Sequence, residues 1–504
     1  MVYYKIIMRH KFFKVFAFML FVLTTGAFFG LASAEDQTYT TFSQIRSILR
    51  PATPEAEIIS GSNDDQTSAL SPRIRTVVRS SAPRAKIISD NKDTNNLATD
   101  VLLSYSSAEP NNLYWDSTFK EVSAINFNPS VLPSGNGHKS FKKMATSGTT
   151  FQIDGADYKI VQEKFEERGL DNYSWFGYVE DSQFLSHFAV YNGAVAGEIW
   201  LPNGGHRSVL TRGGQQFLVK WDEEEISRGL ADDQIPDFSF GLGDTGAPGG
   251  TTHEIRRRLS SLSCPKGQEL VWEKPLLYIY DTTALQWFRG DEDALQTFAQ
   301  ASADGVNAVH VNSLIPNYRV RLAGVREVKY TSAGELSADA GWMQISEEVA
   351  DLKAKTGAIE VGLIIGTTEG MGVGLAGGGF ADPDRHPPIH VFRAGGGVDT
   401  AIHEEGHNDG AGHQIEDWVG WMPAPFAYDW FKDGLGRGIM AIWRSDLCPN
   451  DCLALPVLSN PNVFVNEGRE LGLAGVPVGV PGKAENWRMP ALAYPAFGVN
   501  PVCK

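Results

Sequence analysis

The chain has 504 residues, of which 42% are hydrophobic and 21% charged, so it has the composition of a globular protein long enough for two or more domains. It carries 44 basic and 60 acidic residues, for a net charge of −16. This acidic balance disfavours binding to nucleic acid or to an anionic membrane surface, and we expect neither as a partner.

Residues 1–34 have the pattern of a secretory signal peptide. A basic start is followed by an almost wholly apolar run, Val15 to Gly30, and by the small residues Ala32-Ser33-Ala34. The alternative is an uncleaved membrane anchor, but the run is shorter than the ~20 residues that a span needs. Removal of this segment leaves 40 basic and 60 acidic residues. We therefore expect an exported protein, secreted or periplasmic, with no later membrane span.

Residues 35–263 divide into two parts of different composition. Residues 35–111 are polar and rich in Ser, Thr, Asn and Pro, which indicates a loosely ordered lead-in. Residues 112–263 hold short β-rich segments between Asp-Gly, Asn-Gly and Gly-Gly turns, which predict a small antiparallel β domain and a linker. The segments are 150–153, 158–161, 188–191, 196–200 and 216–220. In the linker, Arg256-Arg257-Arg258 is either a processing site or an exposed basic patch.

In residues 264–504 strands and helices alternate, which predicts an α+β or α/β domain. The predicted strands are 276–280, 320–330 and 360–365, and the predicted helices are 291–311 and 346–356. The Gly-rich stretch 372–377 is either an edge strand or a flexible loop. Gly395-Gly396-Gly397 leads into a further helix with Asp399 or Thr400 as its N-cap, and His386 and His390 are interpreted as loop histidines.

That helix opens the stretch His403-Glu404-Glu405-Gly406-His407-Asn408-Asp409-Gly410-Ala411-Gly412-His413, an H-E-x-x-H-x-x-G-x-x-H pattern. His403 and His407 lie one helical turn apart on the same face. Gly410 permits a turn that returns His413 to the same point. Three imidazoles leave one tetrahedral position of Zn²⁺ open, and Glu404 is placed to act as a general base.

A bare H-E-x-x-H occurs by chance on charged helix faces, but the glycine and third histidine at these offsets do not readily arise by accident. The pattern therefore predicts one catalytic zinc, with His403, His407 and His413 as ligands and Glu404 as the catalytic residue.

The long motif resembles that of the metzincin zinc proteases. Members of that group have a methionine turn beneath the metal, for which Met440 in Gly438-Ile439-Met440-Ala441 is the best candidate and Met422 the second. Segments 276–281, 319–325, 458–461, 472–482 and 484–486 look similar to the peptidyl-Asp metalloendopeptidase family and related reprolysin-like bacterial proteases. The resemblance covers roughly residues 270–500, and implies a metzincin-like catalytic domain in which an edge strand binds the substrate main chain.

Three positions depart from that pattern, and two arginines bear on specificity. Glu405 stands where these relatives have an apolar residue, so its carboxylate needs a partner or water. Gln414 stands where they have Asp, and Ile442 replaces the tyrosine that serves some metzincins as a fifth ligand. The resemblance implies cleavage beside an acidic residue, for which Arg437 or Arg444 could supply a positive pocket.

The four cysteines are Cys264, Cys448, Cys452 and Cys503. In an exported chain they are expected to oxidise, and the short spacing of Cys448 and Cys452 would leave Cys264 to pair with Cys503. The alternative is that Cys264 caps the zinc in a latent form of the enzyme.

These observations predict a secreted zinc-dependent endopeptidase that acts on protein or peptide substrates. The β domain is then a pro-domain that inhibits the enzyme or assists its folding, or else an adhesive or substrate-binding module. The alternative from another class is a non-catalytic secreted zinc protein that binds a ligand through its β domain. A narrower alternative keeps the enzyme and changes its target to a glycoprotein or a cell-wall peptide.

Overall fold

The computed structural model describes residues 101–106, 118–128, 131, 149–169, 171–202, 205–222, 226, 264–366, 374–376, 387–417, 426–442, 444, 446–447, 452–465 and 476–504. All of them belong to one compact unit, Lys92–Lys504. The expected signal peptide and the tribasic run lie outside the described residues. No helix among the described residues is long and apolar enough to cross a membrane.

The N-terminal part of this unit is a nine-stranded, wholly antiparallel sheet in the order β1-β2-β9-β8-β7-β6-β5-β4-β3. Its strands are β1 Leu103–Tyr105, β2 Phe119–Phe127, β3 Thr149–Ile153, β4 Ala156–Gly169, β5 Asn172–Val179, β6 Leu185–Tyr191, β7 Ala194–Trp200, β8 His206–Arg212 and β9 Gln215–Trp221. The five predicted strand segments all fall within it. The sheet begins at Leu103, earlier than the boundary at residue 112 that composition predicted.

Consecutive strands of this sheet pair because their turns are tight. Two-residue hairpin turns require positive φ. Positive φ is found here at Asp154, Gly155, Asn192, Gly193 and Gly213. One side of the sheet buries an apolar cluster that includes Phe151, Ile160, Trp175, Phe188, Ile199 and Leu218.

The C-terminal part is built on a six-stranded mixed sheet in the order β11-β10-β12-β14-β13, with β19 also paired to β10. Its strands are β10 Leu270–Tyr280, β11 Tyr318–Glu327, β12 Glu360–Ile365, β13 Gly374–Ala376, β14 Ile389–Arg393 and β19 Pro501–Cys503. The pairs among β10, β11, β12 and β14 are parallel, whereas β13 and β19 run antiparallel to their neighbours. The mixed α+β class predicted for the chain is therefore observed.

Six helices accompany these sheets in the described part of the chain: α6 Thr282–Trp287, α7 Glu292–Asn312, α8 Leu336–Ile345, α9 Glu347–Thr356, α10 Gly397–Asn408 and α11 Met489–Ala496. The predicted helices 291–311 and 346–356 correspond to α7 and α9. Their N-caps are Asp291 and Ser346, whose side chains accept hydrogen bonds from Ala294 N and Val349 N. Helices α6, α8 and α11 were not predicted.

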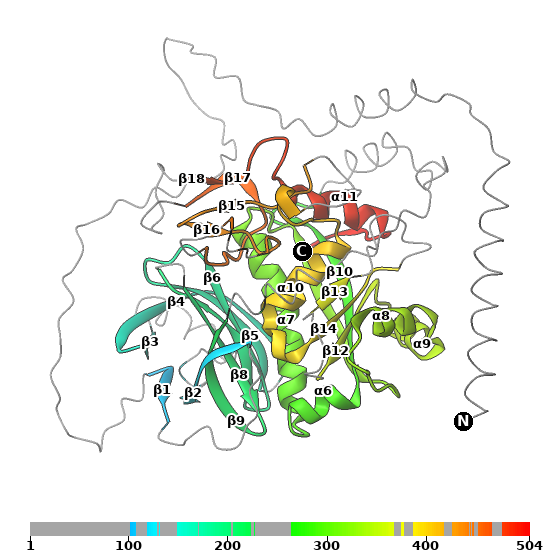
Figure 1. Cartoon of the computed structure of the whole chain (residues 1–504), viewed down its shortest axis with the longest axis horizontal. Helices are drawn as coiled ribbons and strands as arrows, with labels where there is room; N and C mark the ends of the chain where they lie inside the picture. Colours follow the sequence, from blue (N-terminus) through cyan, green and yellow to red (C-terminus); the bar gives the residue numbers. More distant parts are fainter. Residues whose placement is uncertain are drawn as a thin grey trace, which may run out of the picture. The chain divides into compact units, whose positions relative to one another are not determined.

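Helix α7 is the element on which the two sheets meet (Figure 1). It contacts β6 and β7 of the nine-stranded sheet, and also β11 and α10 of the C-terminal part. Because it is covered on several sides, polar residues such as Ser302, Asp304 and His310 are buried along with its apolar residues. The helix that carries the zinc motif, α10, packs directly on it.

The remainder of the C-terminal part consists of short pairs and a disulfide. Strand β15 Phe431–Lys432 pairs with β16 Gly436–Arg437, and β17 Asn460–Val465 pairs with β18 Val476–Val478. Cys264 and Cys503 form a disulfide beside the β10–β19 pair, as predicted. Cys452 is also disulfide-bonded, and Cys448 lies outside the described residues.

Candidate metal centre

The helix that carries the motif begins earlier than its sequence predicts. Helix α10 starts at Gly397 with Gly396 as its N-cap, so the prediction of Asp399 or Thr400 was wrong. Thr400 lies inside the helix and donates from Oγ1 to Gly396 O at 2.7 Å. At the other end Gly410 has a φ of 87°, so the chain turns there as predicted.

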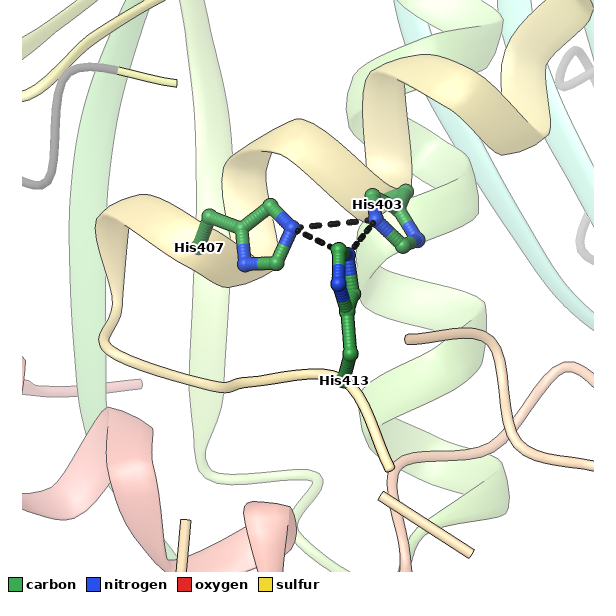
Figure 2. Close-up of side chains that lie close together, drawn as sticks. All are labelled: His403, His407 and His413. Atoms are coloured by element: carbon green, nitrogen blue, oxygen red, sulfur yellow. Dashed lines mark hydrogen bonds between the residues drawn. The ribbon is translucent and has the colours of Figure 1, made fainter. Parts of the chain in front are cut away.

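The turn brings the three motif histidines together (Figure 2). The Nε2 atoms of His403, His407 and His413 lie 3.0 Å from one another in all three pairs. The three side chains come from the helix and from the loop that follows it, and each residue is at least nine-tenths buried. The imidazoles therefore point at a single shared position.

The remaining ring nitrogens determine the chemistry of this position. His403 Nδ1 lies 2.9 Å from Ile439 O, and His407 Nδ1 lies 2.8 Å from Ala411 O. A carbonyl oxygen can only accept, so both Nδ1 atoms carry the proton and both Nε2 atoms present lone pairs. Burial, together with the neighbouring imidazoles, lowers the pKa of His403 and His413 well below the usual range. Neutral rings with converging lone pairs repel one another unless a cation lies among them.

This donor set fits zinc. Two imidazole nitrogens at 2.0–2.1 Å from a tetrahedral ion lie about 3.3–3.4 Å apart, close to the 3.0 Å observed here. Backbone carbonyls that hold Nδ1–H are the usual outer partners of metal-binding histidines. Three nitrogen ligands are also the number found in catalytic zinc sites, where water completes the set.

Glu404, the predicted base, is fully buried beside the edge strand of the sheet. A Cβ atom added to Gly374 of β13 would overlap the Glu404 carboxylate, so the backbone of this strand lies directly against it. The stretch predicted as an edge strand or a loop is thus a strand over Gly374–Ala376, at the sheet edge next to β14. The rest of 372–377 lies outside the described residues.

Met440, the residue interpreted as a methionine turn, packs against α10. It is fully buried, and a Cβ atom added to Gly406 would overlap its sulfur. Ile439, the residue before it, provides the carbonyl that holds His403. Gln414 ties the loop after His413 to the same turn, since it accepts from Ile442 N at 2.9 Å and donates to Ile442 O at 3.0 Å. The other candidate, Met422, lies outside the described residues.

The opposite face of α10 is held by a buried charge cluster that sequence reasoning missed. Lys274 of β10 is fully buried, and its Nζ lies 2.6 Å from Glu360, 2.7 Å from Glu405 and 2.6 Å from Asp409. Glu405 and Asp409 are one turn apart, on the face away from the histidines. The partner that Glu405 needs is therefore Lys274.

Burial and charge act differently on the three carboxylates. Burial tends to raise the pKa of Glu360, but Lys274 and His390 outweigh it and hold that pKa at about 2. Burial raises the pKa of Glu405, and it raises the pKa of Asp409 well above the usual range. The same three carboxylates keep the pKa of Lys274 well above normal despite its burial. The cluster thus contains a charged lysine and a charged Glu360.

Several other predicted residues have structural roles. His390 is on β14 rather than in a loop, and its Nδ1 lies 2.9 Å from Glu360 Oε1, so the prediction for it was wrong. Arg437 is buried and donates to Ala441 O at 2.5 Å, and Arg444 pairs with Asp446 at 2.7 Å. Cys264 cannot cap a metal while it is bonded to Cys503. His386 lies outside the described residues.

Two further groups of metal-type side chains occur among the described residues. One consists of Glu198, His206 and Asp399, and the other of His310, Glu405 and Asp409. In the first, His206 Nε2 lies 3.2 Å from Asp399 Oδ2, and in the second both carboxylates already contact Lys274. Of these groups in the described part of the chain, only the motif histidines have ring nitrogens that all point at one position.

Comparison with known proteins adds little to this geometry. No family model matches the chain, and no curated protein matches it. A solved structure described as "Structure of a chaperone-substrate complex" is similar over 61% of this chain, with 14% identity and a TM-score of 0.35. The chain spans 39% of that structure's chain.

Proposed function

We propose that the protein is a zinc-dependent endopeptidase of the metzincin type, exported from the cell. The observation that carries the proposal is the convergence of three buried Nε2 atoms within 3.0 Å of one another, beside a fully buried glutamate that follows the first histidine. A structural zinc site would not need this glutamate, whereas hydrolysis needs a base at this position.

In this proposal the histidines hold the metal and Glu404 moves the proton. When bound, zinc lowers the pKa of water and polarises the substrate carbonyl. Glu404 accepts the proton of the attacking water and then delivers it to the leaving amine. The carbonyls of Ile439 and Ala411 keep His403 and His407 in the tautomer that binds metal.

The edge strand β13 supplies a binding surface for the substrate main chain. It has β14 on one side, and no described strand pairs with its other side. An extended peptide that pairs with a free strand edge gains main-chain hydrogen bonds that do not depend on its side chains. Because β13 lies against Glu404, a peptide bound there would have its backbone near the base.

The experiment is digestion of a defined unfolded protein by the purified mature enzyme, with cut sites mapped by mass spectrometry. We expect cleavage that 1,10-phenanthroline abolishes and added zinc restores. Glu404→Gln should keep one zinc per chain and lose at least about 100-fold in turnover, the range of one general base. The exposed Glu347 provides the matched control, since Glu347→Gln changes the same chemistry far from the site.

Two outcomes would contradict the proposal. If Glu404→Gln had native turnover, Glu404 could not be the general base. If the purified protein held no stoichiometric zinc, the three histidines would not form a zinc site. Stoichiometric zinc without cleavage of any peptide would favour the alternative of a non-catalytic zinc protein that binds its ligand through the β sheet.

A further inference from the structure

The nine-stranded sheet contacts α7 near its start, its middle and its end. Near the start of the helix, Asn192 Nδ2 donates to Asp293 Oδ1 at 3.1 Å. In the middle, His187 Nε2 lies 3.0 Å from Ala301 O, and at the end Leu185 N donates to Asn312 Oδ1 at 3.0 Å. These contacts are accompanied by a shared apolar cluster of Phe176, Leu185 and Ala308. The interface between the sheet and α7 therefore contains both hydrogen bonds and apolar contacts.

Two buried charged side chains have partners on the other side of this boundary. Arg212 of β8 is 6% exposed, donates from Nε to Trp287 O at 2.5 Å, and lies over the Trp287 ring at 4.2 Å. Asp304 of α7 is 1% exposed and accepts from Ser174 of β5. Separation of the sheet from the C-terminal part would take Arg212 away from the carbonyl and the ring of Trp287, which belong to α6.

The sheet also holds the beginning of the metal-binding helix. Thr118 Oγ1 donates to Gly395 O at 2.7 Å, and His206 Nε2 lies 3.2 Å from Asp399 Oδ2, one turn before His403. A Cβ atom added to Gly397 would lie 2.7 Å from the Trp221 ring, so the helix starts in contact with β9. The direction in which α10 leaves the sheet is therefore set by residues of the N-terminal part.

A third contact joins the sheet to the C-terminal segments. Phe184 and Trp200 belong to the same apolar cluster as residues that follow the zinc motif: Trp430, Leu435, Leu455, Val457, Val463, Val465, Val478 and Ala484. Such a shared core is unlike the hydrated, polar interfaces between domains that move or separate readily.

We propose that the sheet Leu103–Trp221 is a permanent structural partner of the zinc-binding part rather than a detachable pro-domain. A cut in the connector, residues 227–263, would therefore give a two-chain molecule that stays together. Within it, the N-terminal chain would hold α7 and the first turn of α10 in the positions that bring the histidines together. Association of the two fragments does not depend on peptidase activity.

The test uses the full chain with a recognition sequence for a site-specific protease inserted between residues 240 and 250. After complete cutting, native mass spectrometry and size-exclusion chromatography at low micromolar concentration should find both fragments in one 1:1 species. That species should keep the metal content of the uncut protein. Release of the N-terminal fragment in native buffer, with metal retained by the C-terminal fragment, would overturn the inference.

A pair of variants tests whether this surface holds the fragments. In the cut protein, Arg212→Met should speed exchange of the N-terminal fragment with an isotope-labelled copy at least tenfold. The control is Lys220→Met, because Lys220 pairs with Glu121 on the outside of the same sheet at 3.0 Å. Equal exchange rates would mean that the Arg212 surface does not hold the fragments. If the fragments stay together but bind no zinc, the assembly inference stands and the proposed function fails.

Discussion

Lys274 allows a quantitative test of the charge cluster behind α10. It contacts three carboxylates at 2.6–2.7 Å and is fully buried. Lys274→Met would leave those carboxylates without their cation, and loss of one partner of a buried pair costs roughly 3–5 kcal/mol. In a unit of about 400 residues, 1 kcal/mol corresponds to about 1.2 °C at the midpoint of thermal unfolding. We therefore expect the midpoint at pH 7.5 to fall by about 4–6 °C.

The pH dependence separates this mechanism from a packing defect. Without the lysine, the buried carboxylates of the folded state have pKa values above those of the unfolded chain, so folding takes up protons. Stability then falls as pH rises through the folded pKa values, and the deficit should be smaller at pH 5.5 than at pH 7.5. The control is Lys220→Met. It removes the exposed Lys220–Glu121 ion pair, which is worth less than about 1 kcal/mol. Equal midpoints for the two variants, measured by calorimetry at one scan rate, would refute the reasoning.

Three further predictions follow from the geometry of the site and its support. Gly374→Ala should reduce peptidase turnover without loss of zinc, because the new methyl group overlaps the Glu404 carboxylate; unchanged turnover with equal zinc content would contradict this contact. Burial lowers the pKa of His187 to about 4, so stability should fall as pH drops from about 6.5 toward 4, and the fall in denaturation midpoint should be smaller in His187→Gln. Cys264→Ser with Cys503→Ser opens a bridge between residues 239 apart, which should cost about 4–5 kcal/mol in chemical denaturation without altering metal content.

The sequence predicted those elements that depend on residue spacing, apolar runs or helix caps within a short segment. The spacing of His403, His407, Gly410 and His413 predicted both the shared position and the turn, because a helix and one glycine determine them. Strand β12 matched closely because it is a short, nearly continuous apolar run. Helices α7 and α9 matched because each begins at a capping residue, Asp291 or Ser346. The disulfide from Cys264 followed from the short spacing of the other two cysteines.

Features that depend on distant segments could not be predicted in this way. His390 follows two prolines and resembles a loop residue, but parallel pairing of β14 with β12 makes it part of a buried strand. Lys274 lies in a segment that gives no sign of its three partners, which come from two other elements. Helix α8 was missed because its Ala- and Ser-containing sequence has only a weak apolar period. The N-cap was misplaced because Gly396 caps the helix without a side chain.

The hairpin order of the nine-stranded sheet has a consequence for folding during synthesis. From β3 to β9 each strand pairs with the next one in sequence, so most of its contacts are local, and sheets of this kind form earlier than those with crossovers. The six-stranded sheet is parallel and needs long connections between its strands. Because the sheet precedes the histidine segment in the chain, it also emerges first from the ribosome or an export channel, and we expect its hairpins to form first. The slower half of the molecule thus folds against a surface that already exists, which limits the time its unpaired strand edges are exposed.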